Sequence, residues 1–514
     1  MKLFSLMAGT LLSLHLFAQT GFQQTFDING DDEFMSTVQT SDGGYINGGY
    51  STGTPYGGIV VKTTAAGTVQ WSKTVGGTRI TEIAEAGNGN YYAAGEINVS
   101  SNTNFYLVKL SSNGTIIWAR NFGKSAEPDQ LYSMAVTPDG GVILSGNADS
   151  TAGSGFLPVG YVVKVDSSGN HQWSRYVSGG NGEIFYVTKP VSSGGYLSCG
   201  YTGSFGSQVG TEAYAVRWDA NGNILWTSVF GHNNRFDRIY DFVEKPNGGF
   251  FVTGNGLYTS TSDNLWLASL DAAGAVVWHH FYNMYEGAQK LLLLNDGNLA
   301  MSGYNISLNL GIYNQSYLIK TDTTGAIIWA RQYGGGGIID DKFWSASETA
   351  DNGFVFAGST YGTGIMRTSL IVRADSAGIS GCRDSSLTVS ITNLAIASTQ
   401  GGTVSSVSFN GTSPTGQLNA TMTMQFFCGG PTSVPENAME NSRIYPQPAI
   451  DFLNVETDIP ATKIEILSSN GQLIESHQAS GNRNQINVTA LPAGMYFMRI
   501  YSAEGLTVQR FIRH

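Results

Sequence analysis

Acidic residues recur in this chain at a fixed distance before a repeated glycine. The glycine ends seven similar segments, at Gly49, Gly95, Gly146, Gly200, Gly254, Gly303 and Gly358. In six of the seven segments the residue at one equivalent earlier position carries a carboxylate: Asp32, Asp129, Glu183, Asp237, Glu286 and Asp341. The second segment has Thr78 there, with Glu82 as the nearest substitute. Carboxylates that a repeated fold brings together could bind Ca²⁺ or supply the acid and base of a glycosidase.

Large side chains recur three residues after these acidic positions. The residues in the same six segments are Met35, Tyr132, Tyr186, Tyr240, Gln289 and Trp344. Aromatic rings beside polar groups can stack on a ligand, so we predict ligand binding by the six carboxylates together with Tyr132, Tyr186, Tyr240 and Trp344. The alternative is structural: carboxylates also cap turns by accepting backbone N–H groups, and aromatic rings also fill the space between strands.

The residue types give little support for a metal site, a hydrolytic nucleophile or a phosphate-binding site. His279 and His280 are adjacent on an expected strand, where neighbouring side chains point to opposite faces, which is poor geometry for one metal ion. The sequence has no metalloprotease histidine pair, serine nucleophile elbow or phosphate-binding loop. Residues 27–33 only loosely resemble a calcium loop. These motifs therefore identify no catalytic residue, which stays unknown, and we predict no cofactor, with Ca²⁺ considered only for the acidic positions.

The elements that carry these residues are repeats of four short strands. In the fifth repeat the strands are RIYDFVE, GFFVTG, LWLASL and AVVWHHF, separated by glycine-containing turns. Repeats of about 50 residues with four strands each are typical of propeller blades. The sequence thus predicts an all-β fold with a seven-bladed β-propeller over residues 20–381. The acidic positions would lie where each blade's innermost strand begins, around one mouth of the central channel.

The seventh repeat lacks its last strand, and the N-terminus resembles the missing piece. Six repeats carry a tryptophan four positions after a turn glycine, whereas the seventh has Cys382. Residues 22–29 resemble the segment that begins at Trp118. We expect residues 22–29 to complete the seventh blade, because this closes the ring and removes an exposed sheet edge. An open solenoid is the alternative.

The turn and tryptophan signature resembles a known family of repeats. The segments DSSGNHQW, DANGNILW, DAAGAVVW and DTTGAIIW are similar to the tryptophan-docking repeats of quinoprotein-like propellers. This resemblance implies architecture rather than activity. Quinoprotein dehydrogenases have eight blades, and many carry adjacent cysteines beside the cofactor. Seven repeats and no adjacent cysteines argue against a quinone cofactor here.

Composition and the N-terminus indicate an exported protein. Charged residues make up only 13% of the chain and glycine accounts for 66 of 514 residues, which suits a turn-rich extracellular β-protein. The net charge of -11 disfavours nucleic acid as a partner. Residues 1–18 read as a signal peptide with a basic start, an apolar stretch and Ala18 before the cleavage point. No later stretch is expected to span a membrane.

Three segments follow the propeller. Residues 382–428 alternate like short strands, and we expect a small β module that a disulfide between Cys382 and Cys428 closes. Residues 429–442 are rich in Pro, Gly, Ser and Asn and read as a linker. Residues 443–514 again alternate as strands separated by turns, which predicts a β-sandwich.

Motifs in the last segment resemble the type A sorting domain of type IX secretion substrates. The matching residues are Tyr445, Pro446, Pro448, Gly471, Leu491, Pro492, Gly494 and Tyr496, with Arg510 and Arg513 in the final strand. Gln447 stands where the family usually has Asn. The resemblance implies passage through the periplasm, recognition by the type IX machinery, and release or attachment at the outer-membrane surface.

Two functions of the propeller stay open on this evidence. The first is a non-enzymatic module that binds a glycan or a protein through its loop-rich face, where loops such as residues 147–160 and 305–316 are long. The alternative is an extracellular hydrolase, glycosidase-like, that uses carboxylates at the channel mouth. A glycosidase needs two carboxyl groups at about 5–9.5 Å, whereas a structural ring would give similar, locally bonded carboxylates.

Overall fold

The computed structural model consists of β-strands and connecting turns throughout its described part. It divides into two compact units, Met1–Gly430 and Pro431–His514. The described residues are 21–28, 30–99, 102–123, 128–149, 157–206, 210–231, 236–259, 262–285, 287–307, 313–334, 341–361, 366–381, 384–393, 397–399, 404–406, 418–419, 423–428, 443–468, 473–502 and 505–514. The predicted signal peptide, residues 1–18, lies outside them.

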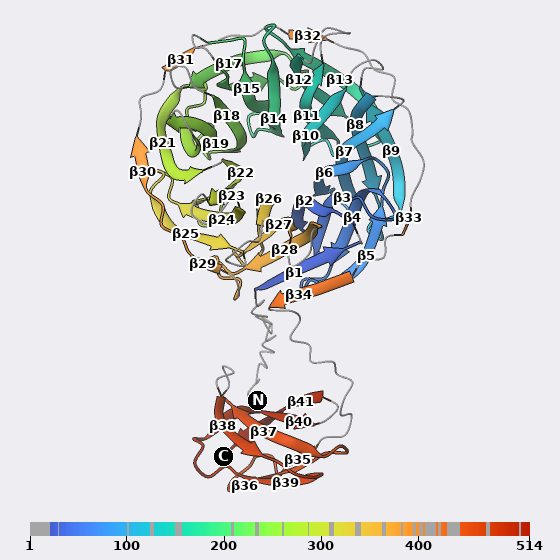
Figure 1. The fold of residues 1–514 in the computed structure, drawn as a ribbon, viewed down its shortest axis with the longest axis vertical. Coiled ribbons are helices and arrows are strands. Elements are labelled where there is room, and N and C mark those ends of the chain that lie inside the picture. The colour runs from blue at the N-terminus through green and yellow to red at the C-terminus, as the bar shows by residue number, and fades with distance from the viewer. Residues whose placement is uncertain are drawn as a thin grey trace, which may run out of the picture. The chain divides into compact units, whose positions relative to one another are not determined.

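Antiparallel sheets surround a central channel in the first unit (Figure 1). Within the described residues there are seven of these sheets, which we number as blades in chain order. The first four blades are β2 (Asp32–Gln39), β3 (Tyr45–Ser51), β4 (Gly57–Thr63), β5 (Val69–Thr74); β6 (Arg79–Glu85), β7 (Tyr91–Val99), β8 (Asn102–Leu110), β9 (Ile116–Phe122); β10 (Asp129–Val136), β11 (Val142–Asp149), β12 (Pro158–Val165), β13 (His171–Val177); and β14 (Glu183–Pro190), β15 (Tyr196–Thr202), β16 (Glu212–Trp218), β17 (Ile224–Gly231).

The last three blades follow the same order, with the innermost strand first. They are β18 (Asp237–Glu244), β19 (Phe250–Thr259), β20 (Ser262–Leu270), β21 (Val276–Tyr285); β22 (Ala288–Leu293), β23 (Leu299–Ser307), β24 (Tyr313–Thr321), β25 (Ile327–Tyr333); and β26 (Asp341–Glu348), β27 (Phe354–Thr360), β28 (Thr368–Ala374) with β1 (Phe22–Asp27). Figure 1 shows the first strand of each blade nearest the channel.

The N-terminal strand closes the ring, as the split repeat predicts. Strand β1 pairs antiparallel with β28, with Phe22 opposite Arg373 and Phe26 opposite Ser369. Phe22 also takes the place of the missing tryptophan, because a side chain at Gly67 in the first blade would meet its ring at 3.1 Å. Strand β1 therefore shares one blade with β26 to β28, which are far from it in the sequence, and it supplies the strand that the seventh repeat lacks.

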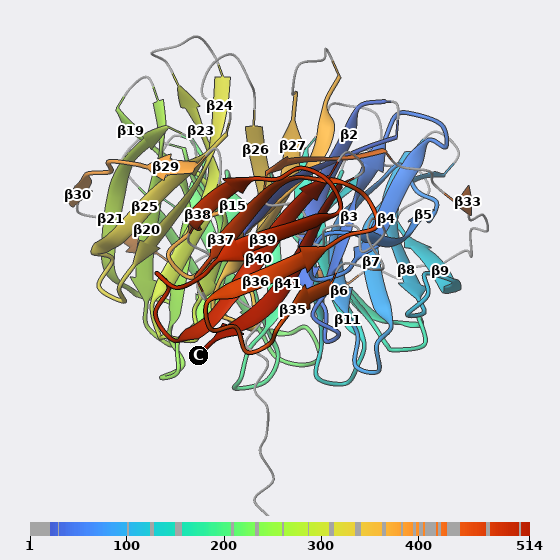
Figure 2. The ribbon, with the colours of Figure 1, turned by 90° about the horizontal axis from the view of Figure 1, so that it is seen from below.

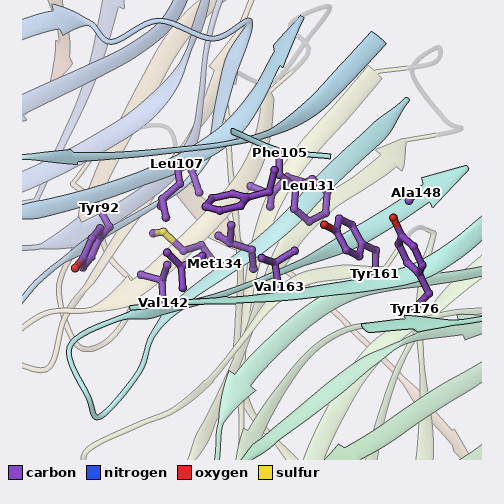
Figure 3. Packing of buried hydrophobic residues seen from close by; sticks show 14 of the residues in the cluster. Tyr92, Phe105, Leu107, Leu131, Met134, Val142, Ala148, Tyr161, Val163 and Tyr176 are labelled. Atoms are coloured by element: carbon purple, nitrogen blue, oxygen red, sulfur yellow. The ribbon is translucent and has the colours of Figure 1, made fainter. Parts of the chain in front are cut away.

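Hydrophobic residues fill the space between neighbouring blades. The cluster between the second and third blades includes Tyr92, Leu107 and Leu131, and in it the ring centroid of Phe105 lies 4.8 Å from that of Tyr161 (Figure 3). Comparable clusters of buried residues join each other neighbouring pair, including the seventh blade with the first. The core is thus a ring of interfaces, and each blade is stabilised by both neighbours.

The repeated tryptophans dock on the following blade. Trp71 of the first blade donates its indole N–H to the carbonyl of Ser112 at 3.1 Å, and Trp173 donates to the carbonyl of Ala220 at the same distance. The turn glycine of the next blade leaves room for the ring: a side chain at Gly114 would lie 2.8 Å from Trp71. This explains why a turn glycine and a tryptophan recur together in the sequence.

Between residues 382 and 428, the strands that the structure describes do not form the separate β module that we expected. These strands are β29 (Asp384–Ser386), β30 (Ile391–Asn393), β31 (Ala397–Thr399), β32 (Val404–Ser406), β33 (Leu418–Asn419) and β34 (Thr423–Cys428). They pair in turn with the outermost strands of blades six, five, four, three, one and seven. We call these strands the belt, since they run around the outside of the ring (Figures 1 and 2).

The expectation of one module was wrong because an alternating pattern does not say which edge a strand joins. Each blade offers an unpaired outer edge, and pairing there satisfies its N–H and C=O groups. The predicted disulfide is not tested: Cys382 and the side chain of Cys428 lie outside the described residues. Cys199, in the fourth blade, is a buried free thiol.

The second unit is a β-sandwich, as predicted. One sheet has the order β35 (Arg443–Tyr445), β36 (Phe452–Glu456), β39 (Arg483–Asn487). The other has the order β38 (Leu473–Gln478), β37 (Ala461–Leu467), β40 (Gly494–Ser502), β41 (Gly505–Arg513) (Figure 2). A cluster that includes Leu453, Ile464 and Met498 forms the core between the two sheets.

Candidate functional site: the central pocket of the propeller

A β-bulge interrupts the innermost strand of every blade at the same position. In the first blade Phe34 pairs with Gly49 and Ser36 pairs with Gly48, so that Met35 between them has no partner across the strand. The corresponding residues of the other blades are Thr81, Tyr132, Tyr186, Tyr240, Gln289 and Trp344. A bulge re-aims one side chain. Here it selects the large residues that the sequence places three positions after the acidic ones.

The repeated glycine makes room for this bulge. A Cβ atom at Gly254 would lie 1.7 Å from the carbonyl oxygen of Arg238, and one at Gly49 would lie 1.9 Å from that of Glu33. Both distances are far inside van der Waals contact, so no side chain fits without moving backbone. The glycine and the residue that it allows to bulge therefore belong to one local structure.

All seven bulge residues line a single pocket in the channel, with a volume of about 370 Å³. The remaining lining residues are Arg79, Glu82, Leu131, Ser133, Val187, Lys290 and Tyr304. The predicted ligand-binding residues Tyr132, Tyr186, Tyr240 and Trp344 are thus brought together. The volume falls within the range of about 300–1,000 Å³ that is usual for small-ligand pockets.

Three tyrosines from consecutive blades form a row along one side of the pocket. The ring centroids of Tyr132 and Tyr186 are 5.0 Å apart, and those of Tyr186 and Tyr240 are 4.8 Å apart. Burial is the main cause that raises the pKa of Tyr132 to about 12, and burial also raises that of Tyr186. The phenols therefore stay neutral at physiological pH and act as hydrogen-bonding groups at the ends of apolar rings.

Trp344 is held by a bond from the seventh blade to the first. Its indole N–H donates to Oε1 of Glu33 at 2.6 Å, and its ring meets that of Tyr304 edge-on at 5.3 Å. Glu33 also forms an ion pair with Arg367 at 3.3 Å. This network fixes the indole plane before any ligand arrives, which reduces the entropy that binding would cost.

The polar part of the pocket comes from the second and sixth blades. Glu82 forms an ion pair with Lys290 and accepts a hydrogen bond from the Ser36 hydroxyl at 2.8 Å. Thr81 and Gln289, the neighbouring bulge residues, belong to the same lining, and Gln289 adds a side-chain amide. At one edge of the pocket Arg79 pairs with Glu96 at 2.6 Å. The pocket therefore combines aromatic faces with hydrogen-bonding groups.

Side chains next to the bulges tie several blades to the following one. The Ser36 hydroxyl accepts the N–H of Ile83 at 3.2 Å, and the Ser133 hydroxyl accepts that of Thr188 at 3.3 Å. The same bond closes the ring, where Thr37 donates its N–H to Ser345 at 3.2 Å. The pocket walls thus rest on rigid strands, and this rigidity keeps the rings in place.

The predicted carboxylates that the structure describes begin the innermost strands but do not line the pocket. Asp32, Asp129, Glu183, Asp237 and Asp341 are all buried, and none of these five lines the pocket. Glu286 lies outside the described residues. The five described carboxylates therefore occupy equivalent positions in their blades. The residues that line the pocket are those three positions later in the sequence.

Two of these carboxylates cap the turn that precedes their strand. Asp32 accepts the N–H of Ile28 at 2.5 Å, and Glu183 accepts that of Gly179 at 3.0 Å. Burial is the main cause that raises the pKa of Asp32 to about 6. Within the described residues no three His, Cys, Asp or Glu side chains are grouped so that they could hold a metal ion. The geometry of Asp32 and Glu183 fits the structural alternative.

A lysine or arginine recurs near the end of the third strand, and it has a local acidic partner in several blades. Lys62 pairs with Asp42 at 2.9 Å, and Lys164 pairs with Asp139 at 2.8 Å. Arg373 pairs with Asp351 in the same way. These pairs lie within single blades, and none of their residues lines the pocket.

Parts of the long loops, residues 150–156 and 308–312, lie outside the described residues.

Sequence reasoning missed the ion pair between Glu82 and Lys290. Glu82 was considered only as a substitute for an acidic position, and Lys290 was not singled out. The two residues are 208 positions apart, so only the closed ring brings them together. A usable signal was present: both directly follow a bulge position, at Thr81 and Gln289.

The sorting motif residues serve two purposes in the second unit. Leu491 and Tyr496 are buried in its core, and the Tyr496 hydroxyl donates to the carbonyl of Pro492 at 2.8 Å. Tyr445 is exposed and donates its hydroxyl to Glu456 at 2.9 Å. Pro446 and Pro448 follow Tyr445 in the turn after β35, and Gly494 begins β40, whereas Gly471 lies outside the described residues.

Comparison with known proteins identifies the second unit. Residues 443–514 match the family described as secretion system C-terminal sorting domain. This domain marks the chain as a type IX secretion substrate that is exported and then secreted or attached to the cell surface. The type IX machinery is therefore its partner in export. Within the described residues, no helix has the length and apolar character needed to cross a bilayer.

Solved structures resemble the chain only distantly. Sqt1 from Chaetomium thermophilum is 12% identical in two crystal structures: one has a TM-score of 0.40 and covers 65% of this chain and 83% of that chain, and the other has 0.41 and covers 71% and 87%. PorZ, a surface component of the type IX secretion system of Porphyromonas gingivalis, is 10% identical with a TM-score of 0.36, covering 92% and 64%. Likeness at this level does not indicate a shared function. No curated protein matches the chain.

Proposed function

We propose that this exported chain is a non-enzymatic glycan-binding protein that holds a sugar in the central pocket of its propeller. The observation that carries the proposal is the row of Tyr132, Tyr186 and Tyr240, which shares one pocket with Gln289, Thr81 and an ion pair. A sugar ring has apolar C–H faces and hydroxyl groups at its edge. Aromatic rings suit the faces, and fixed donors and acceptors suit the hydroxyl groups.

A glycan fits this pocket better than a protein segment does. A protein interface commonly buries about 800 Å² on each partner, over a broad surface with a polar rim. The feature found here is instead a pocket of about 370 Å³ in a channel. Its small size and fixed walls favour one or two sugar units at the end of a chain.

The arrangement of carboxylates favours binding over hydrolysis. A glycosidase needs two carboxyl groups that flank the scissile bond. Among the described lining residues Glu82 is the one carboxylate, and it is already paired with Lys290. The buried carboxylates that cap turns, Asp32 and Glu183, do not line the pocket. The hydrolase alternative therefore has no specific observation in its favour.

The proposal is tested by removing one ring from the centre of the row. Tyr186→Ala deletes the ring that contacts both neighbouring tyrosines, and we expect at least a tenfold weaker affinity for the strongest ligand on a glycan array. Tyr56→Ala is the matched control, because Tyr56 is 66% exposed in a loop outside the pocket and should not matter. Calorimetric titration of the mature chain measures both. Equal affinity of wild type and Tyr186→Ala would place the ligand elsewhere.

A further inference from the structure

The ion pair between Glu82 and Lys290 crosses the channel. Glu82 lies on β6 in the second blade, and Lys290 lies on β22 in the sixth. Blades three, four and five separate them on one side, and blades seven and one on the other. The pair is therefore a chord across the ring rather than a contact between neighbours. It divides the channel into a larger part and a smaller part.

The larger part contains the tyrosine row. Tyr132, Tyr186 and Tyr240 belong to blades three, four and five, and they line the same pocket as Glu82 and Lys290. A ligand in this pocket therefore has aromatic rings on one side and a carboxylate beside an ammonium group on the other. The two charged groups are bonded to each other, so their positions relative to the row are fixed.

Both charged groups keep hydrogen-bonding capacity for a ligand. A carboxylate can accept about four hydrogen bonds and an ammonium group can donate three. Glu82 accepts one bond from Lys290 and one from Ser36. The side chains of Glu82 and Lys290 are 13% and 22% exposed, so the remaining sites reach the pocket. The ion pair thus places a hydrogen-bond acceptor, Glu82, beside a hydrogen-bond donor, Lys290.

The ion pair of Glu82 and Lys290 has no net charge, although each of its two side chains is charged. Burial lowers the pKa of Lys290, but the charges of Glu82 and Asp241 outweigh it and hold that pKa above its ordinary value. Asp241 has its own partner, Lys189, at 2.5 Å. A ligand carboxylate that took Lys290 would leave Glu82 partly buried and unpaired, which is strongly unfavourable.

We infer that the pocket selects an uncharged sugar with two adjacent hydroxyl groups, one donating to Glu82 and the other accepting from Lys290. The C–H face of the same sugar packs on Tyr186. This inference rests on the proposed function and narrows its ligand class. It assigns Glu82 and Lys290 as the residues that discriminate neutral glycans from acidic ones.

The test uses a glycan array that pairs each neutral hexose oligosaccharide with its hexuronic acid counterpart. Wild-type mature chain should bind the neutral member of its best pair at least tenfold more tightly. Glu82→Gln removes the charge but keeps the shape, and should bring that ratio close to one by freeing Lys290 for a carboxylate. Exchanging both charges, with Glu82→Lys and Lys290→Glu, should keep the neutral preference. Glu85→Gln, on the same strand but outside the pocket, is the control.

The outcomes separate the inference from the proposed function. Wild-type chain that binds the acidic member equally or better would overturn the inference while the glycan pocket stands. An unchanged ratio in Glu82→Gln, with a melting temperature close to wild type, would overturn it as well. Wild-type chain that binds no glycan would reject both. The ratio of the wild-type affinities for the neutral and the acidic glycan tests the inference even where a variant fails to fold.

Discussion

At the scale of single residues, the repeated glycines are the positions where the fold tolerates least change. We predict that Gly254→Ala lowers the free energy of unfolding by at least about 2 kcal/mol, because its Cβ would lie 1.7 Å from the carbonyl oxygen of Arg238. Gly87→Ala is the control, since a Cβ there meets no atom within 4 Å. Urea unfolding of both variants measures the difference. Equal stability would mean that the bulge does not require a glycine.

A second prediction at this scale concerns pH. Burial raises the pKa of Asp32 from its ordinary value of 3.8 to about 6. The folded state therefore holds this proton more tightly than the unfolded state, and the stabilisation is complete below about pH 3.8 and lost as pH rises through 6. The wild type should thus lose about 2 kcal/mol relative to Asp32→Asn between pH 4 and pH 7.

The contribution of Asp42 to stability should change with pH in the opposite direction to that of Asp32. Burial alone would raise its pKa, but hydrogen bonds from Thr40 and Lys62 outweigh burial and hold the pKa below 3.8. Its contribution is present above the ordinary pKa and is lost as pH falls through the folded value. Unfolding is therefore compared from about pH 2 to pH 7: the Asp42 contribution, measured against Asp42→Asn, should be lost at the acid end, whereas the Asp32 contribution, measured against Asp32→Asn, should be lost towards neutral pH. Parallel trends would rule out burial of Asp32 as the cause.

Some site residues were predictable from the sequence, and others were not. A fixed distance from the repeated glycine gives Tyr132, Tyr186 and Tyr240 equivalent places, because each blade repeats the same local structure. The same distance could not say that Asp32 is absent from the pocket lining and accepts a backbone N–H of the preceding turn instead. The bond between Glu82 and Lys290 depends on closure of the whole ring, which no local pattern encodes.

At the scale of elements, the belt covers the outer edges of six blades. We predict that a chain ending at residue 381 still forms the ring, because the clusters between blades are built almost wholly from residues before the belt. Its exposed strand edges should promote self-association and lower the melting temperature. Light scattering and thermal melting measure these effects.

A chain ending at residue 430 is the matched control for the belt. It keeps β29 to β34 and lacks only the sorting domain, so it should stay monodisperse and melt like the mature chain. Self-association of both truncated chains to the same extent would show that the belt does not protect the edges. A monodisperse chain ending at residue 381 would show the same.

Closure by the N-terminus was predictable, whereas the belt was not. Residues 22–29 resemble a strand that six complete repeats define, so the gap in the seventh repeat shows where they belong. Strands β29 to β32 have three residues each and no repeated signature. Their partners lie on different blades, and alternation of side chains is the same at every edge.

At the scale of the whole molecule, export depends on the sorting domain. We predict that deletion of residues 443–514 leaves the propeller folded in the periplasm, because its core shares no residue with that domain. Fractionation of cells and medium measures the location. Tyr186→Ala in the full chain is the control, and it should reach the surface or the medium like wild type. Normal secretion of the deleted chain would contradict the assignment of the sorting signal.

The most direct test of the central claim is a crystal structure of the mature chain with the strongest ligand from the glycan array. The account predicts a sugar ring packed against Tyr186 in the central pocket, with hydroxyl groups within hydrogen-bond distance of Glu82 and Lys290. A saturated crystal with the glycan bound on the outer loops and an empty central pocket would contradict it.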